Sequence, residues 1–140
     1  MEIFFESNLR FWPQGATVTQ LAASPTWPPC FAAVGYAPCL RAWKPEGEAT
    51  AAQFSPVHSL LEVDGSNFVA CCIQDGRLAA AESSGRIGIW DTVTWSRVHT
   101  LSAGAEVTAL ALSNAHVAVG TACGAVMAWQ CEAGSEECKQ

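Results

Sequence analysis

Cysteine and histidine are the residue types in this chain that could hold a metal ion, because thiolate and imidazole are usual zinc ligands. The closest approach to a ligand set is formed by Cys123, Cys131 and Cys138 together with His116. Their spacings match no common zinc pattern, and no two cysteines form a CxxC pair. We therefore expect no metal site, and we keep this set of four residues as the alternative.

The same residue types could also serve catalysis, with a cysteine as nucleophile and a histidine as its base. Cys71 or Cys72 would need a neighbouring histidine and a third group to orient it, and nothing close in the sequence supplies them. The histidines lie in or beside predicted strands, where a structural role is expected: His58, His99 and His116. The chain lacks GxSxG, P-loop, HExxH and dinucleotide-binding glycine motifs. We expect no catalytic residues, no cofactor and no enzymatic activity.

The cysteines are better explained as core residues. There are 7 of them, an odd number, and most lie inside apolar runs. In a reducing compartment such residues behave as small hydrophobic side chains. Residues 1–6 carry acids where a signal peptide needs bases, and they lack a long apolar centre. We therefore expect a cytoplasmic or nuclear protein.

Charge and hydropathy narrow the classes of partner. The chain has 140 residues, enough for one domain with a real core, and its net charge is -6 with only 7 Lys and Arg. Nucleic-acid-binding proteins gain much of their affinity from clustered cations, so nucleic acid and anionic membrane surfaces are disfavoured. No uninterrupted apolar run reaches the roughly 18 residues of a membrane-spanning helix. We expect neither a nucleic-acid nor a membrane partner.

Residues 77–130 repeat one pattern of predicted strands. These strands are the elements that must position any functional side chain. An apolar run turns at Ser83-Ser84-Gly85 into a second run that ends in Trp90-Asp91. The same plan follows with a turn at Ala122-Cys123-Gly124 and a run that ends in Trp129-Gln130. The separation of the two tryptophans is close to the roughly 40–45-residue period of a four-stranded propeller blade.

This plan resembles the WD40 repeat over about residues 16–130. The third strand of that repeat ends in Trp-Asp, which stands here as Trp90-Asp91, with Trp43-Lys44 and Trp129-Gln130 as degenerate versions. The Gly-His before the innermost strand and the usual aspartate in the turn between the second and third strands are missing. The resemblance implies an all-β fold, a partial β-propeller of about three four-stranded antiparallel blades. It also implies that Trp43, Trp90, Asp91 and Trp129 are structural residues, with the tryptophans buried at equivalent positions.

The expected propeller segment covers residues 1–130. Its blades are expected over about residues 16–63, 64–101 and 102–130, and the outer strand of the first over 57–63. Residues 3–12 are expected to form an orphan outer strand of some other blade, and residues 131–140 a flexible acidic tail. The runs Ala79-Ala80-Ala81 and Val117-Ala118-Val119-Gly120 fit sheets that are buried on both faces, as propeller blades are. A β-sandwich is the alternative fold, because it also uses short strands at this spacing.

The resemblance implies a non-catalytic scaffold that binds proteins or peptides. Aromatic and arginine side chains dominate such surfaces, so exposed loops that carry them are candidates. Trp27 lies in a proline-rich loop, Trp95 in the turn after Trp90, and Arg86 at the opposite rim. For each of these two tryptophans the alternative is a ring folded over its own blade edge, and for the arginine a solvated side chain.

The number of blades raises the question of closure. Closed propellers have about four to eight blades, and three predicted blades leave an apolar face and unpaired strand edges at each end. We therefore expect a homo- or hetero-oligomer through open blade edges. The alternatives for function are a structural subunit completed by another chain or a second copy, or a truncated propeller fragment without independent function.

Overall fold

The computed structural model describes residues 17–24, 30–35, 39–45, 54–57, 67–113 and 115–131. All regular structure in this part of the chain is β-strand, so the expected all-β fold is confirmed. None of the described residues belongs to a helix that could cross a bilayer. The expected strand over residues 3–12, Trp27 and the tail beyond Cys131 lie outside the described residues.

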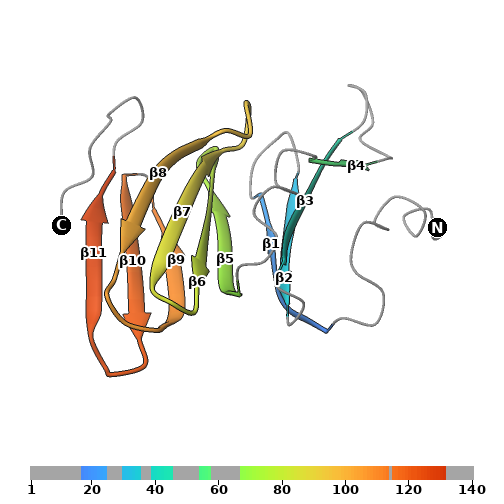
Figure 1. Cartoon of the computed structure of the whole chain (residues 1–140). Coiled ribbons are helices and arrows are strands. Elements are labelled where there is room, and N and C mark those ends of the chain that lie inside the picture. The colour runs from blue at the N-terminus through green and yellow to red at the C-terminus, as the bar shows by residue number, and fades with distance from the viewer. Residues whose placement is uncertain are drawn as a thin grey trace.

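The strands form three antiparallel sheets that stand in a row (Figure 1). The first sheet contains β1 (Val18–Ala23), β2 (Phe31–Gly35), β3 (Cys39–Pro45) and β4 (Phe54–Pro56). The second contains β5 (Phe68–Gln74), β6 (Arg77–Glu82), β7 (Arg86–Asp91) and β8 (Arg97–Ser102). The third, within the described residues, contains β9 (Val107–Leu112), β10 (His116–Thr121) and β11 (Val126–Gln130). Each sheet is a meander in which consecutive strands pair.

Turn residues set the register of these meanders. Asp75 and Gly76 join β5 to β6 with φ angles of 51° and 76°, as a tight hairpin turn requires. Gly85 and Gly124 occupy the turns between the second and third strands of their sheets, before β7 and β11, also with positive φ. At Gly85 an added Cβ would lie 2.5 Å from the carbonyl oxygen of Ala105, so only glycine fits.

The outer strand of the first sheet differs from the expectation. It was expected over residues 57–63, whereas β4 ends at Pro56. The reason is that β3 continues past Trp43 to Pro45, so its partner begins earlier, with Phe54 opposite Pro45. Val57, the next residue, is buried and its N–H donates to the Ala42 carbonyl oxygen at 2.9 Å.

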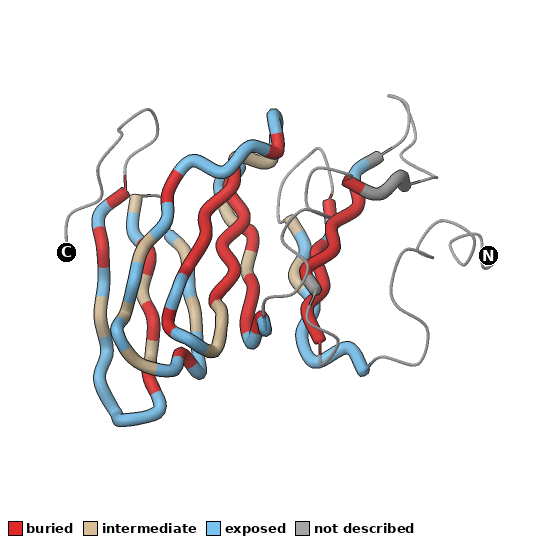
Figure 2. The backbone as a smooth tube through the Cα atoms, in the orientation of Figure 1, coloured by how far each residue is buried: buried red, intermediate tan, exposed pale blue. Residues whose placement is uncertain are grey.

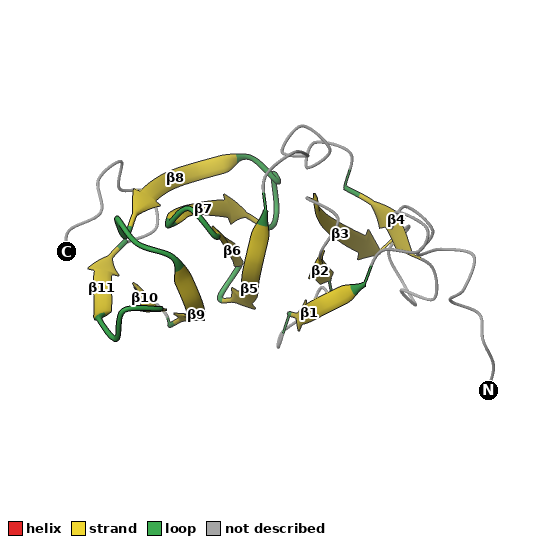
Figure 3. Ribbon diagram, turned by 60° about the horizontal axis from the view of Figure 1, so that its bottom comes forward, coloured by secondary structure: helices red, strands yellow, loops and turns green. Residues whose placement is uncertain are grey.

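The three sheets pack face to face, with one hydrophobic cluster in each of the two spaces between them. The first strand of each sheet lies on the same side of the row, and β5 lies against both β1 and β9 (Figure 3). A hydrogen bond also joins two sheets: the Cys71 backbone N–H donates to Gln20 Oε1 at 2.7 Å. This stacking buries both faces of the middle sheet, which explains why Ala79, Ala80 and Ala81 are all fully buried.

Candidate partner-binding faces

The repeat tryptophans lie on the third strand of each sheet and are buried. Trp43 on β3 faces Phe31 across the ladder, Trp90 on β7 faces Leu78, and Trp129 on β11 faces Val117. The indole N–H of Trp43 has no hydrogen-bond acceptor in the described part of the chain. The three indoles are therefore core residues and are not available as binding anchors.

The surroundings of Trp90 show how closely this site is packed. Its ring lies over Gly88 on the same strand, where an added Cβ would approach Cη2 to 2.6 Å. The Arg97 guanidinium carbon lies 4.8 Å from the centroid of the ring, a cation–π distance. The neighbouring Asp91 is structural too, because its Oδ1 accepts hydrogen bonds from the N–H groups of Val93 and Thr94 at 2.7 and 3.1 Å.

The expectation that Trp95 presents an exposed ring is corrected by the structure. Its side chain is only 5% exposed and belongs to the cluster between the first and second sheets. The backbone explains this: Trp95 has a φ of 57°, and its N–H donates to the Asp91 carbonyl oxygen at 2.7 Å. This left-handed residue ends the turn so that the indole packs inward, as in the alternative of a ring folded over its own blade.

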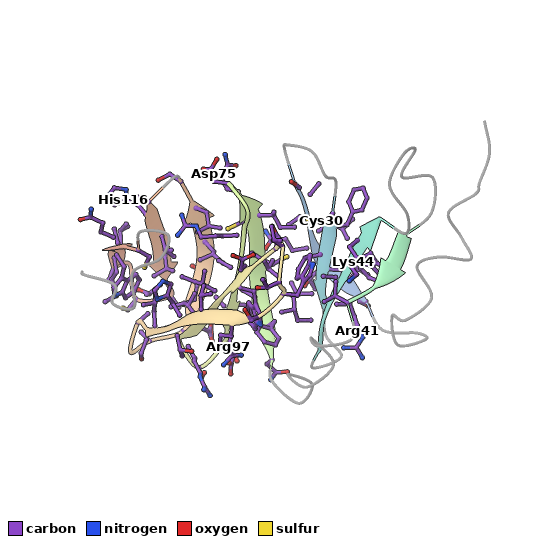
Figure 4. All side chains as sticks on the ribbon, turned by 90° about the horizontal axis from the view of Figure 1, so that it is seen from above. Cys30, Arg41, Lys44, Asp75, Arg97 and His116 are labelled. Atoms are coloured by element: carbon purple, nitrogen blue, oxygen red, sulfur yellow. The ribbon has the colours of Figure 1, made fainter. Side chains whose placement is uncertain are left out.

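The remaining candidates do not form a site either. Trp27 lies outside the described residues, and Arg86 is exposed at the start of β7. The titratable side chains are spread along the row of sheets: Figure 4 shows Arg41 on the first sheet, Asp75 and Arg97 on the second, and His116 at the far end. No three His, Cys, Asp or Glu side chains among the described residues gather closely enough to hold a metal ion.

The cysteines divide into three environments. Burial raises the pKa of Cys71 to about 12 and that of Cys72 to about 11, so both are inert thiols at neutral pH. Cys123 is exposed in the β10–β11 turn, where hydrogen bonds to the Thr121 hydroxyl and the Ala125 backbone lower its pKa. Cys131 is disulfide-bonded, which corrects the expectation of a free thiol and removes it from the alternative metal set.

Arg77 is a structural residue that sequence analysis did not single out. Its guanidinium is buried and donates to the carbonyl oxygen of Cys131 at 2.8 Å and to that of Ser113 at 2.7 Å. The positive charge also contributes, after burial, to a lowered pKa of His99 on β8. A buried arginine thus ties the start of β6 to the ends of two strands in the next sheet. The only sequence signal for this structural role is that the arginine directly follows an Asp-Gly turn.

The outer side of the third sheet is an open apolar surface in the described part of the chain. Its residues are small, and we call this set the alanine face: Ala109, Ala111, Ala118, Gly120, Val126 and Ala128. All are exposed or half-buried, and Figure 2 shows pale blue and tan stretches along this sheet. Val126 is 81% exposed. Large side chains of the same strands, such as Val117 and Trp129, point the other way into the core.

Two exposed apolar side chains lie on the outer side of the first sheet. Leu21 on β1 is 70% exposed and Phe31 on β2 is 37% exposed. Both belong to the side of the sheet that carries Trp43, since Leu21 pairs with Ala33, and Phe31 with Trp43. Trp43, Ala33 and Arg41 on the same side are buried, so only part of this side is exposed.

Comparison with known proteins shows the architecture. No protein-family model and no curated protein sequence matches the chain. Among solved structures, the computationally designed Ika8 protein is similar with a TM-score of 0.63 and 18% identity, over 85% of this chain and 35% of its own. BamB from Moraxella catarrhalis is similar with a TM-score of 0.59 and 13% identity, over 81% of this chain and 33% of its own. A ctPRC2 structure in complex with H3K27me3 and H3K27M matches with a TM-score of 0.61 and 15% identity, over 84% and 28%.

These matches are to propeller-type structures. The fold is a partial β-propeller. The chain spans about a third of the length of these three structures. The identities are low, so the likeness describes the fold alone.

Proposed function

We propose that this chain is a non-catalytic protein-interaction scaffold of the WD40-repeat type, and that it holds another polypeptide against an open sheet face. The observation that carries the proposal is the alanine face, an exposed apolar surface at the end of a stack whose middle sheet is buried on both faces. Monomeric proteins seldom expose contiguous apolar surfaces of this kind unless a partner covers them. The structural similarity to chains from protein assemblies such as ctPRC2 supports this role.

The chemistry of the described residues favours a polypeptide partner. The alanine face carries no charge, and the whole chain has a net charge of -6, which suits neither phosphate backbones nor anionic lipid. Exposed β-strands add a second mode of contact, because a free strand edge can pair with a strand of another chain. In the described part of the chain β11 is such an edge, since β10 is its only partner.

Site-specific photo-crosslinking tests the proposal in cells that make the protein. A photoreactive amino acid replaces Ala128 at the centre of β11, or the exposed Ala122 in the neighbouring turn as the matched control. We expect a covalent adduct with a polypeptide from position 128 and much less from position 122. Peptide mass spectrometry of the adduct shows whether the captured polypeptide is a second copy or a different protein. Absence of any polypeptide adduct at 128, or equal adducts at both positions, would overturn the scaffold proposal.

A further inference from the structure

Two arginines on the outer strands of the second sheet have no polar partner in the described part of the chain. Arg86 begins β7 and Arg97 begins β8, and both are exposed. Neither guanidinium makes a hydrogen bond or an ion pair with a described residue. Arg41 and Arg77, in contrast, donate to backbone carbonyl oxygens. Arg86 and Arg97 therefore keep their N–H donors available for a ligand.

The ladder between β7 and β8 places these two side chains on one face. Arg86, Gly88 and Trp90 share a face of β7, because side chains alternate along a strand. Arg97 belongs to the same face, since it pairs with Trp90 and its guanidinium carbon lies 4.8 Å from the centroid of that ring. The ring itself lies over Gly88, the next residue of this face toward Arg86. Stacking on Trp90 therefore brings the Arg97 guanidinium toward Arg86.

The charges around Arg97 agree with this arrangement. Partial burial and the positive charge of Arg86 lower the pKa of Arg97, and the negative charge of Glu82 at the end of β6 raises it. Two positive charges and one negative charge leave this group of three side chains with a net charge of +1. One carboxylate neutralises that charge, whereas a phosphate dianion would exceed it. The local charge therefore favours a carboxylate ligand.

We infer that Arg86 and Arg97 bind an acidic segment of a partner polypeptide through the carboxylate of an aspartate or glutamate side chain. The inference rests on the proposed scaffold function, which makes the partner a polypeptide, and it adds a second binding surface on another sheet. Arginine suits this ligand because its planar guanidinium can donate two parallel hydrogen bonds to one carboxylate. Stacking on Trp90 restrains Arg97, so less side-chain freedom is lost on binding.

The surroundings of the two arginines favour a polypeptide over a small carboxylic acid. Exposed ion pairs contribute little by themselves, so a small acid would bind weakly. A polypeptide can add contacts with β8, where Val98 is 44% exposed and the hydroxyl-bearing Thr100 and Ser102 are exposed as well. Among the described strands β8 is an edge of its sheet (Figure 1). An extended partner segment beside it would turn every second side chain toward the arginine face.

Fluorescence anisotropy with the purified full chain tests the inference. The probe is a labelled short peptide in which threonine and glutamate alternate, and two companion peptides carry glutamine or phosphoserine in place of glutamate. We expect saturable binding of the glutamate peptide that weakens as salt concentration rises. The glutamine peptide should bind at least about tenfold more weakly, because it lacks the charge. Equal binding of the glutamate and glutamine peptides would overturn the inference, and tighter binding of the phosphoserine peptide would overturn the assignment of a carboxylate.

Substitutions assign the binding to the two arginines. Arg86→Gln and Arg97→Gln should each weaken binding of the glutamate peptide about three- to tenfold, since each removes a charged donor. Lys44→Gln is the matched control, because it removes one exposed positive charge from β3 of the first sheet, and it should bind like the wild type. Figure 4 shows Lys44 and Arg97 on different sheets. A double variant, Arg86→Gln with Arg97→Gln, that binds like the wild type would exclude this site.

Chemical modification of the wild type covers the case in which a substitution disturbs folding. Phenylglyoxal modifies arginine side chains, and peptide mass spectrometry shows which ones react. The glutamate peptide should protect Arg86 and Arg97, and the glutamine peptide should not. Unchanged reactivity of both arginines in the presence of the glutamate peptide would overturn the inference.

This inference and the proposed function can fail separately. A polypeptide adduct from position 128, without binding of the glutamate peptide, would leave the scaffold function standing and exclude the arginine site. Protection of Arg86 and Arg97 by the glutamate peptide, without any adduct from position 128, would support the arginine site and overturn the role proposed for the alanine face.

Discussion

The Nη1 atom of Arg77 lies 2.8 Å from the carbonyl oxygen of Cys131, so a buried guanidinium on β6 binds the chain just after β11. Its Nη2 atom donates to the Ser113 carbonyl oxygen, which follows β9, at 2.7 Å. One side chain therefore satisfies two backbone acceptors at the ends of two strands in the neighbouring sheet. This arrangement fixes the second sheet against the third by polar contacts as well as by apolar packing.

Arg77→Met should destabilise the chain, because it removes two charge-assisted hydrogen bonds and leaves two carbonyl oxygens without their donor. The expected loss in the free energy of unfolding is about 2–4 kcal/mol. Urea titration followed by tryptophan fluorescence measures it. Arg86→Met is the control on the same sheet, since Arg86 is exposed, and its effect should stay within about 0.5 kcal/mol. Equal effects from the two substitutions would contradict the structural role of Arg77 between the second and third sheets.

Gly88→Ala should also destabilise the chain, through overpacking under Trp90. The added Cβ would lie 2.6 Å from Cη2 of the indole, so the buried ring must move. Such strain typically costs about 1–3 kcal/mol. Gly120→Ala is the matched control within a strand, because its Cβ would lie 3.7 Å from the Ala109 Cβ, an ordinary contact. Thermal unfolding of both variants checks the difference, and a fully stable Gly88→Ala variant would contradict the close packing of the Trp90 ring on Gly88.

Trp95→Ala should lower the free energy of unfolding, whereas substitution of an exposed binding residue would leave stability almost unchanged. The ring is 5% exposed in the cluster shared by the first and second sheets, and emptying a large aromatic site costs about 3–5 kcal/mol. Val93→Ala in the same turn is the control, because Val93 is 81% exposed, and should be close to neutral. Chemical denaturation decides between the two roles. A Trp95→Ala variant as stable as the wild type would show that the Trp95 ring does not contribute to the core.

Trp95 also shows where sequence reasoning reached its limit. The period of Trp90 and Trp129 and the Asp75-Gly76 turn predicted the sheets, because strand spacing and turn geometry are local properties of a sequence. The direction of the Trp95 ring depends on a positive φ at a residue that rarely adopts one, and nothing in the sequence marks it. The acceptors of Arg77 lie in the next sheet, far along the chain, so its role appears only when the sheets are stacked.

The sequence alone did not show which residues form the outer side of the third sheet. Counting strands predicted an apolar surface at each end of the row. Which residues form it depends on the alternation of side chains along β10 and β11, and both faces of these strands are apolar in sequence. Register resolved the ambiguity by placing Ala118 and Ala128 together on the outer side, opposite Val117 and Trp129.

Thiol reactivity offers a last test of the local electrostatics. Cys123 is exposed and its pKa lies below the usual value, because hydrogen bonds to the Thr121 hydroxyl and the Ala125 backbone stabilise the thiolate. A lower pKa gives more thiolate near neutral pH, and thiolate is the form that iodoacetamide alkylates. Burial acts in the opposite direction on Cys71 and Cys72, whose pKa values rise to about 12 and about 11. In the folded chain Cys123 should therefore be alkylated first, by at least about tenfold in rate over Cys71.

Peptide mass spectrometry after short alkylation pulses between pH 7 and pH 9 measures these rates. Thr121→Val removes the hydroxyl whose Oγ1 lies 3.2 Å from the Cys123 sulfur, so it should raise the pKa of Cys123 and slow its alkylation at pH 7. At a pH well above the pKa of Cys123 in both the wild type and Thr121→Val, the two alkylation rates should converge, since the thiol is then fully ionised in each. Urea should abolish the preference for Cys123 over Cys71 by exposing every thiol. Equal alkylation of Cys71 and Cys123 in the folded chain would show that burial does not protect the core of the second sheet.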